Sequence, residues 1–325
     1  MASFDLRKLL TIIQSRYNPQ TCPSHKPRFS SGLALSVLDE KCKNCSGLPL
    51  ISVCIPVYNG FLYLGETINS VLSQDYDNLE IIIQDNASTD GTWPMLQSLA
   101  AAHPQISIMR NEQNVGMSGN WNLVVNRASG DYVMLLSADD LLEKGFLESC
   151  LQKIEQEEVD AVTTNHYWFG KGQKNLCYAR IPARIYCNFS SLILLSNPFS
   201  INFTLFSKRV VEHLKRRGRF FSINLLSCDY EMWIRFSLSG MRLYYIDKPL
   251  GSYRLHEDNL SRHVMRMNRH AAMAVLKNRS GLEKACKFIY RITLIRFAFR
   301  VLICMIWYKK LDKRQFSVLL AHLFR

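Results

Sequence analysis

The amino-acid sequence predicts an α/β fold, with a mostly parallel sheet flanked by helices and followed by a helical C-terminal tail. Two observations support this prediction. Short apolar, β-branched runs typical of buried strands alternate with segments of helical spacing between about residues 49 and 169. Such alternation produces right-handed βαβ crossovers, and therefore parallel strands. The length of 325 residues and the 48% hydrophobic content are sufficient for a large buried core.

The expected elements follow one another in regular order. The first strand lies in PLISVCIPVYN, and the spacing of ETINSVLSQ then places Ile68, Val71 and Leu72 on one face of a helix. Thr89 and Asp90 are candidate caps for the next helix, because their side-chain oxygens can accept from its first N–H groups. The alternation continues with strands at 79–85, 106–111, 130–140 and 159–169, and with helices at 89–103, 119–129 and 146–157.

We divide the chain into an N-terminal extension at 1–48, a catalytic domain at 49–262 and a basic, apolar helical region at 263–325. The N-terminal MASFDLRKLLTIIQ lacks a long apolar core followed by a small-residue cleavage site, so we expect no signal peptide. No stretch reaches about 18 uninterrupted apolar residues, so we expect no membrane-spanning helix.

The chain is strongly basic and its cysteines are scattered. The formal net charge of +13 favours an anionic partner, but charge alone does not rank nucleic acid, anionic lipid and phosphorylated ligands. Cys42 and Cys45 form a single CxxC with Cys22 upstream, which is weak evidence for zinc. Cys54 and Cys150 lie among apolar residues and are expected in the core. We infer a reducing compartment and hence a cytoplasmic location.

Ligands of parallel sheets bind beyond the carboxyl ends of the strands, and here polar or acidic residues follow three strands. Asp85 follows the apolar run LEIIIQ and begins DNASTDGT. The residues that follow are turn and cap formers, so an ordinary strand-to-helix turn is one interpretation. In the other, the Asp85 carboxylate accepts hydrogen bonds from a nucleobase or a ribose.

Asp139 and Asp140 lie side by side at the third strand end, in LLSADD. Adjacent carboxylates repel each other unless a cation or a proton intervenes. Mg²⁺ in proteins typically uses one or two carboxylates together with substrate phosphates, so a cation site is one interpretation. The other is a solvated loop, or an N-terminal cap for the helix expected near residue 144.

Two further segments carry residues suited to catalysis. CDYEMWIRF at 228–236 places Asp229 and Trp233 four residues apart, on one helical face. An acid beside an aromatic ring suits a sugar hydroxyl, although an amphipathic surface helix with Trp233 in the core explains the pattern equally well. SYRLHEDNLS at 252–261 carries Arg254 and His256 on one side of an extended segment, suited to a phosphate clamp and a metal ligand.

In this order, the pieces from about Leu50 to Ser261 resemble the family 2 glycosyltransferases, which are inverting, nucleotide-sugar-dependent enzymes with the GT-A fold. The resemblance rests on ISVCIPVYNG, LEIIIQDNASTDGT, the run from RNEQNVG to MLLSADD, CDYEMWIRF and YRLHEDNLS. It implies a Rossmann-like sheet and transfer of a sugar to an acceptor hydroxyl in polysaccharide, glycolipid or other cell-surface glycan synthesis. The residues outside this range lie outside the resemblance.

The resemblance also implies roles for individual residues. Asp229 corresponds to the catalytic base, and Asp139 with His256 to the ligands of a divalent cation, Mg²⁺ or Mn²⁺. Tyr230 and Trp233 are expected to bind the acceptor. The residues expected to bind the nucleotide sugar are Pro56, Tyr58, Asn59, Asp85, Ala138, Asp140 and Arg254.

Three positions depart from the family pattern. Ser137 stands where the DxD element often has its first acid, Asn86 replaces a common Asp, and Cys228 precedes the base where many members have Glu. These departures leave open a catalytically weakened nucleotide-sugar-binding protein of the same fold. A nucleotidyltransferase would show a Gly-rich, Lys- or Arg-bearing loop where this chain reads PVYNGF. A nucleic-acid-binding protein is suggested only by charge, so we expect no nucleic-acid partner.

The C-terminal region offers two interpretations. Residues 284–310 are apolar nearly all round a helix, but Arg291, Arg296 and Arg300 interrupt them. Either this segment caps the catalytic domain, or it contacts an anionic membrane peripherally at the inner face. The basic residues that favour a membrane are Lys309, Lys310, Lys313 and Arg314. Acceptor specificity is expected in 165–225, where the sequence shows no interpretable motif.

Overall fold

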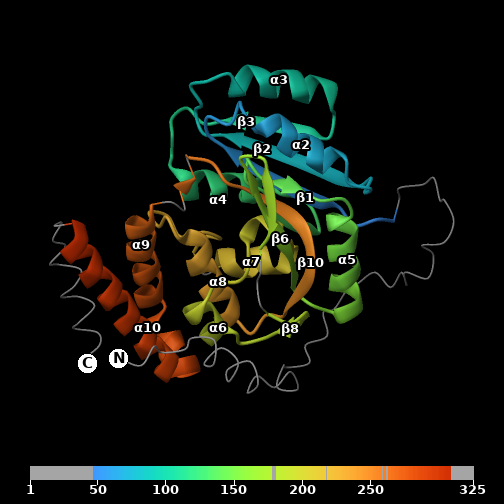
Figure 1. Ribbon diagram of the computed structural model, residues 1–325. Helices are drawn as coiled ribbons and strands as arrows, with labels where there is room; N and C mark the ends of the chain where they lie inside the picture. The colour runs from blue at the N-terminus through green and yellow to red at the C-terminus, as the bar shows by residue number, and fades with distance from the viewer. Residues whose placement is uncertain (1–46, 178–180, 217, 258, 261–262, 309–325) are drawn as a thin grey trace.

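The computed structural model describes residues 47–177, 181–216, 218–257, 259–260 and 263–308. Its centre is one ten-stranded sheet (Figure 1), with strand order β3-β2-β1-β4-β9-β6-β10-β5. Two further strands extend it, because β7 pairs with β6 and β8 pairs with β10. The expected α/β fold is confirmed.

The first half of the chain follows the expected alternation of strands and helices. β1 pairs in parallel with both β2 and β4, and β2 with β3, so these four strands form a continuous parallel block. The elements are β1 (Ile51–Val57), α2 (Leu64–Leu72), β2 (Leu79–Asp85), α3 (Thr92–Ala102), β3 (Ile106–Arg110), α4 (Met117–Arg127), β4 (Tyr132–Leu135), α5 (Phe146–Glu157) and β6 (Ala161–Gly170).

The second half of the chain makes the sheet mixed rather than mostly parallel. The four-residue strand β9 runs antiparallel to both β4 and β6, whereas β10 is parallel to β6. The short strands lie in stretches whose patterns are too brief to indicate a strand. The elements are β5 (Leu141–Leu142), β7 (Gln173–Leu176), β8 (Arg184–Tyr186), α6 (Ser190–Leu195), η2 (Ile201–Phe203), β9 (Thr204–Ser207), α7 (Lys208–Arg216), α8 (Cys228–Leu238) and β10 (Leu243–Arg254).

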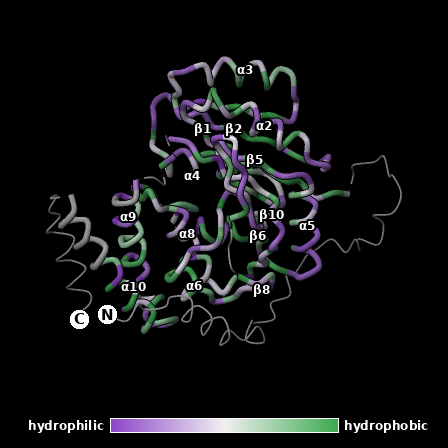
Figure 2. The backbone as a smooth tube through the Cα atoms, viewed as in Figure 1, coloured by the Kyte–Doolittle hydropathy of each residue, from purple (hydrophilic) through white to green (hydrophobic). Residues whose placement is uncertain are grey.

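Alternate residues of the parallel strands serve two separate cores. In β1, Val53 and Ile55 face the core that contains Leu64 of α2, whereas Cys54 faces the core that contains Val124 of α4. All seven residues of β1 are buried, as its continuous β-branched and apolar run requires. Figure 2 shows hydrophobic residues concentrated in the central strands and hydrophilic ones along the outer side of helices such as α5.

The C-terminal region begins as a helical cap on the domain. α9 (Val264–Lys277) and α10 (Arg279–Tyr308, with a kink at Cys286) pack beside α8 and α6 (Figure 1). Leu282, Tyr290 and Leu294 of α10 are fully buried in the same cluster as α8. This bears out the cap interpretation for the first half of α10. Lys309, Lys310, Lys313 and Arg314 lie outside the described residues. Within the described chain no helix is long and apolar enough to cross a membrane.

The cysteines fall into two groups. Cys54 and Cys150 are buried free thiols, as expected, and burial raises the pKa of each well above the ordinary value. Cys187, in contrast, is disulfide-bonded, so the cysteines do not by themselves support a reducing compartment. Cys22, Cys42 and Cys45 lie outside the described residues.

Candidate functional site

The three polar strand ends lie at one edge of the sheet. β2, β1 and β4 are adjacent strands, and Val57 at the end of β1 pairs with Asp85 at the end of β2. The Leu136 N–H donates to the Cys54 carbonyl at 2.9 Å, so β4 stays beside β1 beyond its last regular residue. Because parallel strands end together, the segments after all three strands share one face of the molecule.

The segment after β1 combines a buried wall with an exposed ring. Pro56 is buried in β1, whereas the Tyr58 side chain is 50% exposed and free to cover a ligand. Asn59 has a φ of 51°, and its Oδ1 accepts from the Thr89 N–H at 2.9 Å. Asn59 therefore links this segment to the turn after β2. The nucleotide-binding roles of these three residues stay predictions.

Asp85 is fully buried and its carboxylate is already satisfied. It accepts from the backbone N–H and hydroxyl of Ser88 and lies 3.2 Å from the Arg110 guanidinium. These contacts fit the turn interpretation, and contact with a base stays a prediction. In the same turn Asp90, rather than Thr89, accepts from the Thr92 N–H at 3.0 Å, at the start of α3.

Asp139 and Asp140 occupy a tight turn between β4 and β5. The Asp140 N–H donates to the Ser137 carbonyl at 3.2 Å, and β5 then pairs with β10. α5 begins at Phe146 with Gly145 at its N-cap, so neither acid caps that helix and the cap interpretation is wrong. The Ala138 carbonyl in this turn accepts from the Thr67 hydroxyl at 2.9 Å, which anchors the turn to α2.

His256 meets Asp139 across this turn. The His256 Nε2 and Asp139 Oδ2 atoms are 2.8 Å apart, and both side chains are partly exposed, at 17% and 28%. The His256 ring also lies against Tyr63, with ring centroids 5.1 Å apart. His256 Nδ1 is buried and has no hydrogen-bond partner among the described residues. The two residues expected to hold a cation are therefore brought together.

Asp140 has a different environment from Asp139. It is fully buried, and it accepts from the Arg254 backbone N–H at 2.9 Å and from the Asn202 Nδ2 at 2.5 Å. Burial, and next the neighbouring Asp139 charge, raise the pKa of Asp140 well above its ordinary value. Its oxygens are used internally, so Asp140 shapes the turn and is not open to a nucleotide sugar in this structure.

Asn202 of η2 is a site residue that the sequence did not indicate. Besides donating to Asp140, its Oδ1 accepts from the Ser137 hydroxyl at 3.1 Å. Ser137, which stands where an acid is common, thus contacts an amide instead. Asn202 lies in a segment without an interpretable motif, and only the fold brings it to the turn.

The Arg254 guanidinium group contacts four residues of the described chain. Its Nε donates to the Asp139 carbonyl at 2.8 Å, and its terminal nitrogen lies 2.6 Å from the Glu66 carboxylate. The guanidinium lies 4.5 Å from the ring centroids of both Tyr63 and Phe169. These contacts position the turn, and Glu66 competes with any phosphate for this cation. The expected phosphate contact of Arg254 stays a prediction.

Asp229 is the second residue of α8 and is partly buried. Burial raises the pKa of its carboxyl above the ordinary value, while the backbone N–H groups of Tyr230 and of Asp229 itself act in the opposite direction. Tyr230 is partly buried against the core. A base with a raised pKa accepts a proton more strongly, which suits the expected role of Asp229.

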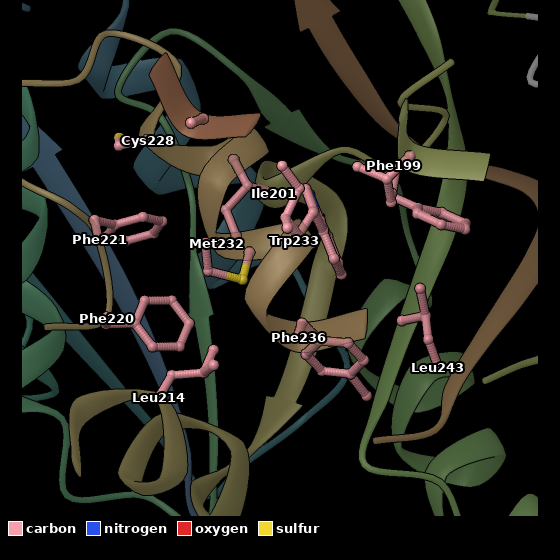
Figure 3. Close-up of a cluster of buried hydrophobic side chains, with 14 of the residues drawn as sticks. Phe199, Ile201, Leu214, Phe220, Phe221, Cys228, Met232, Trp233, Phe236 and Leu243 are labelled. Atoms are coloured by element: carbon pink, nitrogen blue, oxygen red, sulfur yellow. The ribbon is translucent and has the colours of Figure 1, made fainter. Parts of the chain in front are cut away.

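Trp233 does not bind an acceptor in this structure, and this expectation is corrected. Its side chain is fully buried, with its ring 5.5 Å from Phe199, 5.8 Å from Phe206 and 5.7 Å from Phe236. Figure 3 shows it inside the apolar cluster, together with Ile201 and Met232. The large apolar ring gains more from this core than from solvent exposure, as the amphipathic-helix interpretation allowed.

The same cluster connects α8 to the acidic turn. Ile201 packs in the cluster with Met232 and Trp233, and the next residue, Asn202, holds Asp140. The position of the α8 N-terminus, and with it Asp229, is thereby coupled to the Asp139–Asp140 turn through two consecutive residues of η2.

The donor set at the turn fits a divalent cation only in part. The described residues contain no group of three or more His, Cys, Asp and Glu side chains that could hold a metal ion. Asp139 and His256 supply one carboxylate and one imidazole nitrogen. Mg²⁺ commonly takes one or two carboxylates and completes its shell with phosphate oxygens and water. The pair therefore fits a cation that arrives with a diphosphate.

The sequence profile of glycosyl transferase family 2 matches residues 52–223, which is more than half of the chain. The chain belongs to glycosyl transferase family 2. Among its curated relatives, glycosyltransferase GlyA of Streptococcus pneumoniae is 26% identical over 71% of this chain and 34% of GlyA. Abequosyltransferase RfbV of Salmonella typhimurium is 32% identical over 62% of this chain and 65% of RfbV. The chain thus spans about a third of the length of GlyA.

Two solved structures share the fold of this family 2 chain. TarS 1-349 of S. aureus, in complex with UDP-GlcNAc, aligns with a TM-score of 0.66 and 19% identity over 84% of this chain and 80% of TarS. The mannosyltransferase PcManGT from Pyrobaculum calidifontis, in complex with GDP-Man and Mn²⁺, aligns with a TM-score of 0.55 and 18% identity over 84% of this chain and 79% of PcManGT. The expected GT-A fold is confirmed.

Proposed function

We propose that this chain transfers a sugar, with inversion, from a nucleotide-diphosphate sugar to an acceptor hydroxyl. The observation that carries the proposal is the 2.8 Å contact of Asp139 with His256 at the strand ends. Asp229 lies in the first turn of α8, which packs against Ile201 of η2, and the neighbouring Asn202 donates to Asp140. Membership of family 2 and the nucleotide sugars bound by TarS and PcManGT support the same reaction class.

In the proposed mechanism, Asp229 accepts the acceptor hydroxyl proton while that oxygen attacks the anomeric carbon. The nucleoside diphosphate leaves from the opposite face of the sugar, which inverts the configuration. The raised pKa of Asp229 favours this proton transfer. Tyr58 covers the nucleotide, and the buried contacts of Asp140 and Arg254 keep the turn rigid during the reaction.

A divalent cation, Mg²⁺ or Mn²⁺, is expected to stabilise charge on the leaving diphosphate when it is bound. Asp139 Oδ2 and His256 Nε2 are the groups that would hold it, since they converge and are partly exposed. The buried Asp140 would support Asp139 without contacting the ion.

The alternative is a catalytically weakened nucleotide-sugar-binding protein. Incubation with a panel of nucleotide sugars and Mn²⁺ or Mg²⁺, followed by measurement of nucleoside diphosphate release, separates the two. The proposed function requires release that falls about a hundredfold or more in Asp139→Ala and in Asp229→Asn. The matched control Asp75→Asn, at an exposed position, should retain it. Nucleotide-sugar binding without release in the parent chain would favour the alternative.

We also place the reaction in polysaccharide, glycolipid or other cell-surface glycan synthesis. Relatives include a putative teichuronic acid biosynthesis glycosyltransferase of Bacillus subtilis, 39% identical over 32% of this chain and 41% of that protein. The acceptor is a sugar or lipid-linked molecule in this proposal.

The proposed location is the cytoplasmic face of an anionic membrane. The net charge of +13 and the exposed apolar side chains Phe288 and Ile295 of α10, at 72% and 55%, support peripheral contact. A chain that ends near Gly281 would lack the buried core residues Leu282, Tyr290 and Leu294. The test of membrane contact therefore uses substitutions in the full chain. Replacement of Lys309, Lys310, Lys313 and Arg314 by Ser should reduce sedimentation with phosphatidylserine vesicles, and unchanged sedimentation would contradict this location.

A further inference from the structure

A hollow opens beside α4, and neither Asp139 nor His256 lines it. It has a volume of about 650 Å³ and lies between α4 and the segment that joins α7 to α8. Its polar lining includes Asn122, Asn126, Asn224, Lys215 and Arg219. None of the residues that line it is acidic. We refer to it below as the α4–α7 groove.

Residues 218–224 form one wall of this groove, and hydrogen bonds fix this wall in place. Asn122 of α4 donates from Nδ2 to the Phe221 carbonyl at 2.8 Å and accepts from the Phe221 N–H at 3.0 Å. The next residue, Ser222, donates to the Glu231 carboxylate at 2.8 Å and accepts from Lys277 Nζ at 2.6 Å. α4, the wall and α8 are therefore held in one fixed arrangement.

The wall segment also precedes α8, the helix that carries the proposed base Asp229. Ile223 and Asn224 line the groove, and the chain runs from them into α8, whose second residue is Asp229. Glu231, which anchors the wall through Ser222, lies on the same first turn of α8 as Asp229. A molecule bound at the Asn224 end of the groove would thus contact a residue that lies five positions before Asp229 in the chain.

The chemistry of the lining suits a charged carbohydrate. Exposed Asn126 offers both a donor and an acceptor to sugar hydroxyls, and Ile223, 43% exposed, offers an apolar surface to a ring face. Arg219 is exposed and has no hydrogen-bond or ion-pair partner among the described residues. Lys215 donates to the Val125 carbonyl at 3.2 Å and adds a second positive charge. Two cations in a lining without a carboxylate favour an anionic ligand.

We propose that the α4–α7 groove is the acceptor subsite and that it takes an anionic glycan, with Arg219 as the main charge contact. This inference rests on the proposed function, since it concerns the acceptor of the same reaction. It adds a ligand class, acidic sugar chains, and the residues that select it.

The test uses a hyaluronan hexasaccharide as an anionic probe and maltohexaose as a neutral probe of equal length. Calorimetric titration of the full chain at low ionic strength should show tighter binding of the anionic probe, and added salt should weaken it. Arg219→Glu should weaken the anionic probe about fivefold to tenfold, in keeping with one reversed charge contact. Asn126→Ala should weaken both probes.

Arg127→Glu is the matched control, because Arg127 is exposed on α4, does not line the groove, and gives the same change in net charge. It should leave the binding of both probes nearly unchanged. Equal affinity for the two probes, or equal effects of Arg219→Glu and Arg127→Glu, would overturn the proposal.

Binding of UDP and GDP with Mn²⁺ is measured on the same samples. Arg219→Glu could retain nucleotide binding and bind the hyaluronan hexasaccharide as tightly as the parent does. That result would contradict the acceptor subsite and leave the proposed function standing. Absence of nucleotide binding and of sugar transfer in the parent chain would count against the proposed function instead.

Discussion

The Asp139 carboxylate and the His256 imidazole lie 2.8 Å apart, although they come from the turn after β4 and from the segment after β10. These two strands are not neighbours in the sheet; β9 and β6 lie between them. The contact therefore depends on the complete strand order, and it gives the molecule a site where one carboxylate and one imidazole converge.

Loss of the His256 ring should weaken the binding of a nucleotide that arrives with a cation. We expect His256→Ala to reduce the affinity for UDP or GDP about tenfold or more in Mn²⁺, because the ring contacts Asp139 directly. In EDTA the variant and the parent should bind equally. Titration calorimetry measures both, with His103→Ala as the control, and an equal loss in EDTA and Mn²⁺ would contradict a role in cation binding.

Asn202 should act as a positioning residue for the acidic turn. Asn202→Ala leaves the buried Asp140 Oδ2 without its donor, and we expect a loss of about 1–3 kcal/mol in the free energy of unfolding. Asn202→Asp should be at least as harmful, since it places a second carboxylate beside Asp140. In the fraction that remains folded, the KM for the donor should rise and kcat should fall. The control Asn69→Ala, at an exposed position, should match the parent. Normal kinetics in Asn202→Ala would show that the turn does not need this contact.

Trp233 should behave as a core residue and not as an acceptor platform. Trp233→Ala should lower the free energy of unfolding by about 3–5 kcal/mol, because it opens a large cavity among Phe199, Phe206 and Phe236. Urea denaturation measures this change. Trp233→Phe should keep most of the stability and leave the acceptor KM close to that of the parent. A selective rise in acceptor KM would show that the ring reaches the substrate.

The site was predictable from sequence where one short segment carries the pattern. The buried strands, the acids at their ends and the acid at the start of α8 follow from local apolar runs and family-like motifs. Asn202 and Glu66 could not be found in this way, because their partners lie far away in the chain and only the packed sheet brings them together. Trp233 was ambiguous, since four-residue spacing does not say which face of a helix is buried.

The mixed sheet was missed for a related reason. β9 has four residues and β5 has two, so neither carries enough period-two pattern to be recognised. The antiparallel pairing of β9 is set by its neighbours β4 and β6, not by its own composition.

His166 should make the fold less stable in mild acid. Burial lowers the pKa of His166 from 6.5 to about 4, and its ring lies 5.1 Å from that of Phe203. Between these two pH values the unfolded chain binds the proton and the folded chain does not, so the stability falls as the pH falls. The full contribution is about 3 kcal/mol, since one pKa unit corresponds to about 1.4 kcal/mol. Thermal unfolding from pH 7 to pH 4 should show a smaller loss in His166→Asn than in the parent. Equal slopes would contradict a buried neutral imidazole.

The central claim, that Asp229 is the base of a sugar-transfer reaction, is tested most directly by Asp229→Asn. The measurement is the rate of nucleoside diphosphate release coupled to sugar transfer, followed with pH and accompanied by titration of the nucleotide. We expect Asp229→Asn to lower the transfer rate about 10²–10⁴-fold while nucleotide affinity and thermal stability stay close to those of the parent. In the parent, the acid limb of kcat/KM should lie above the ordinary range of an aspartate, because burial raises the pKa of Asp229. Full transfer activity in Asp229→Asn, with the acid limb unchanged, would contradict the account.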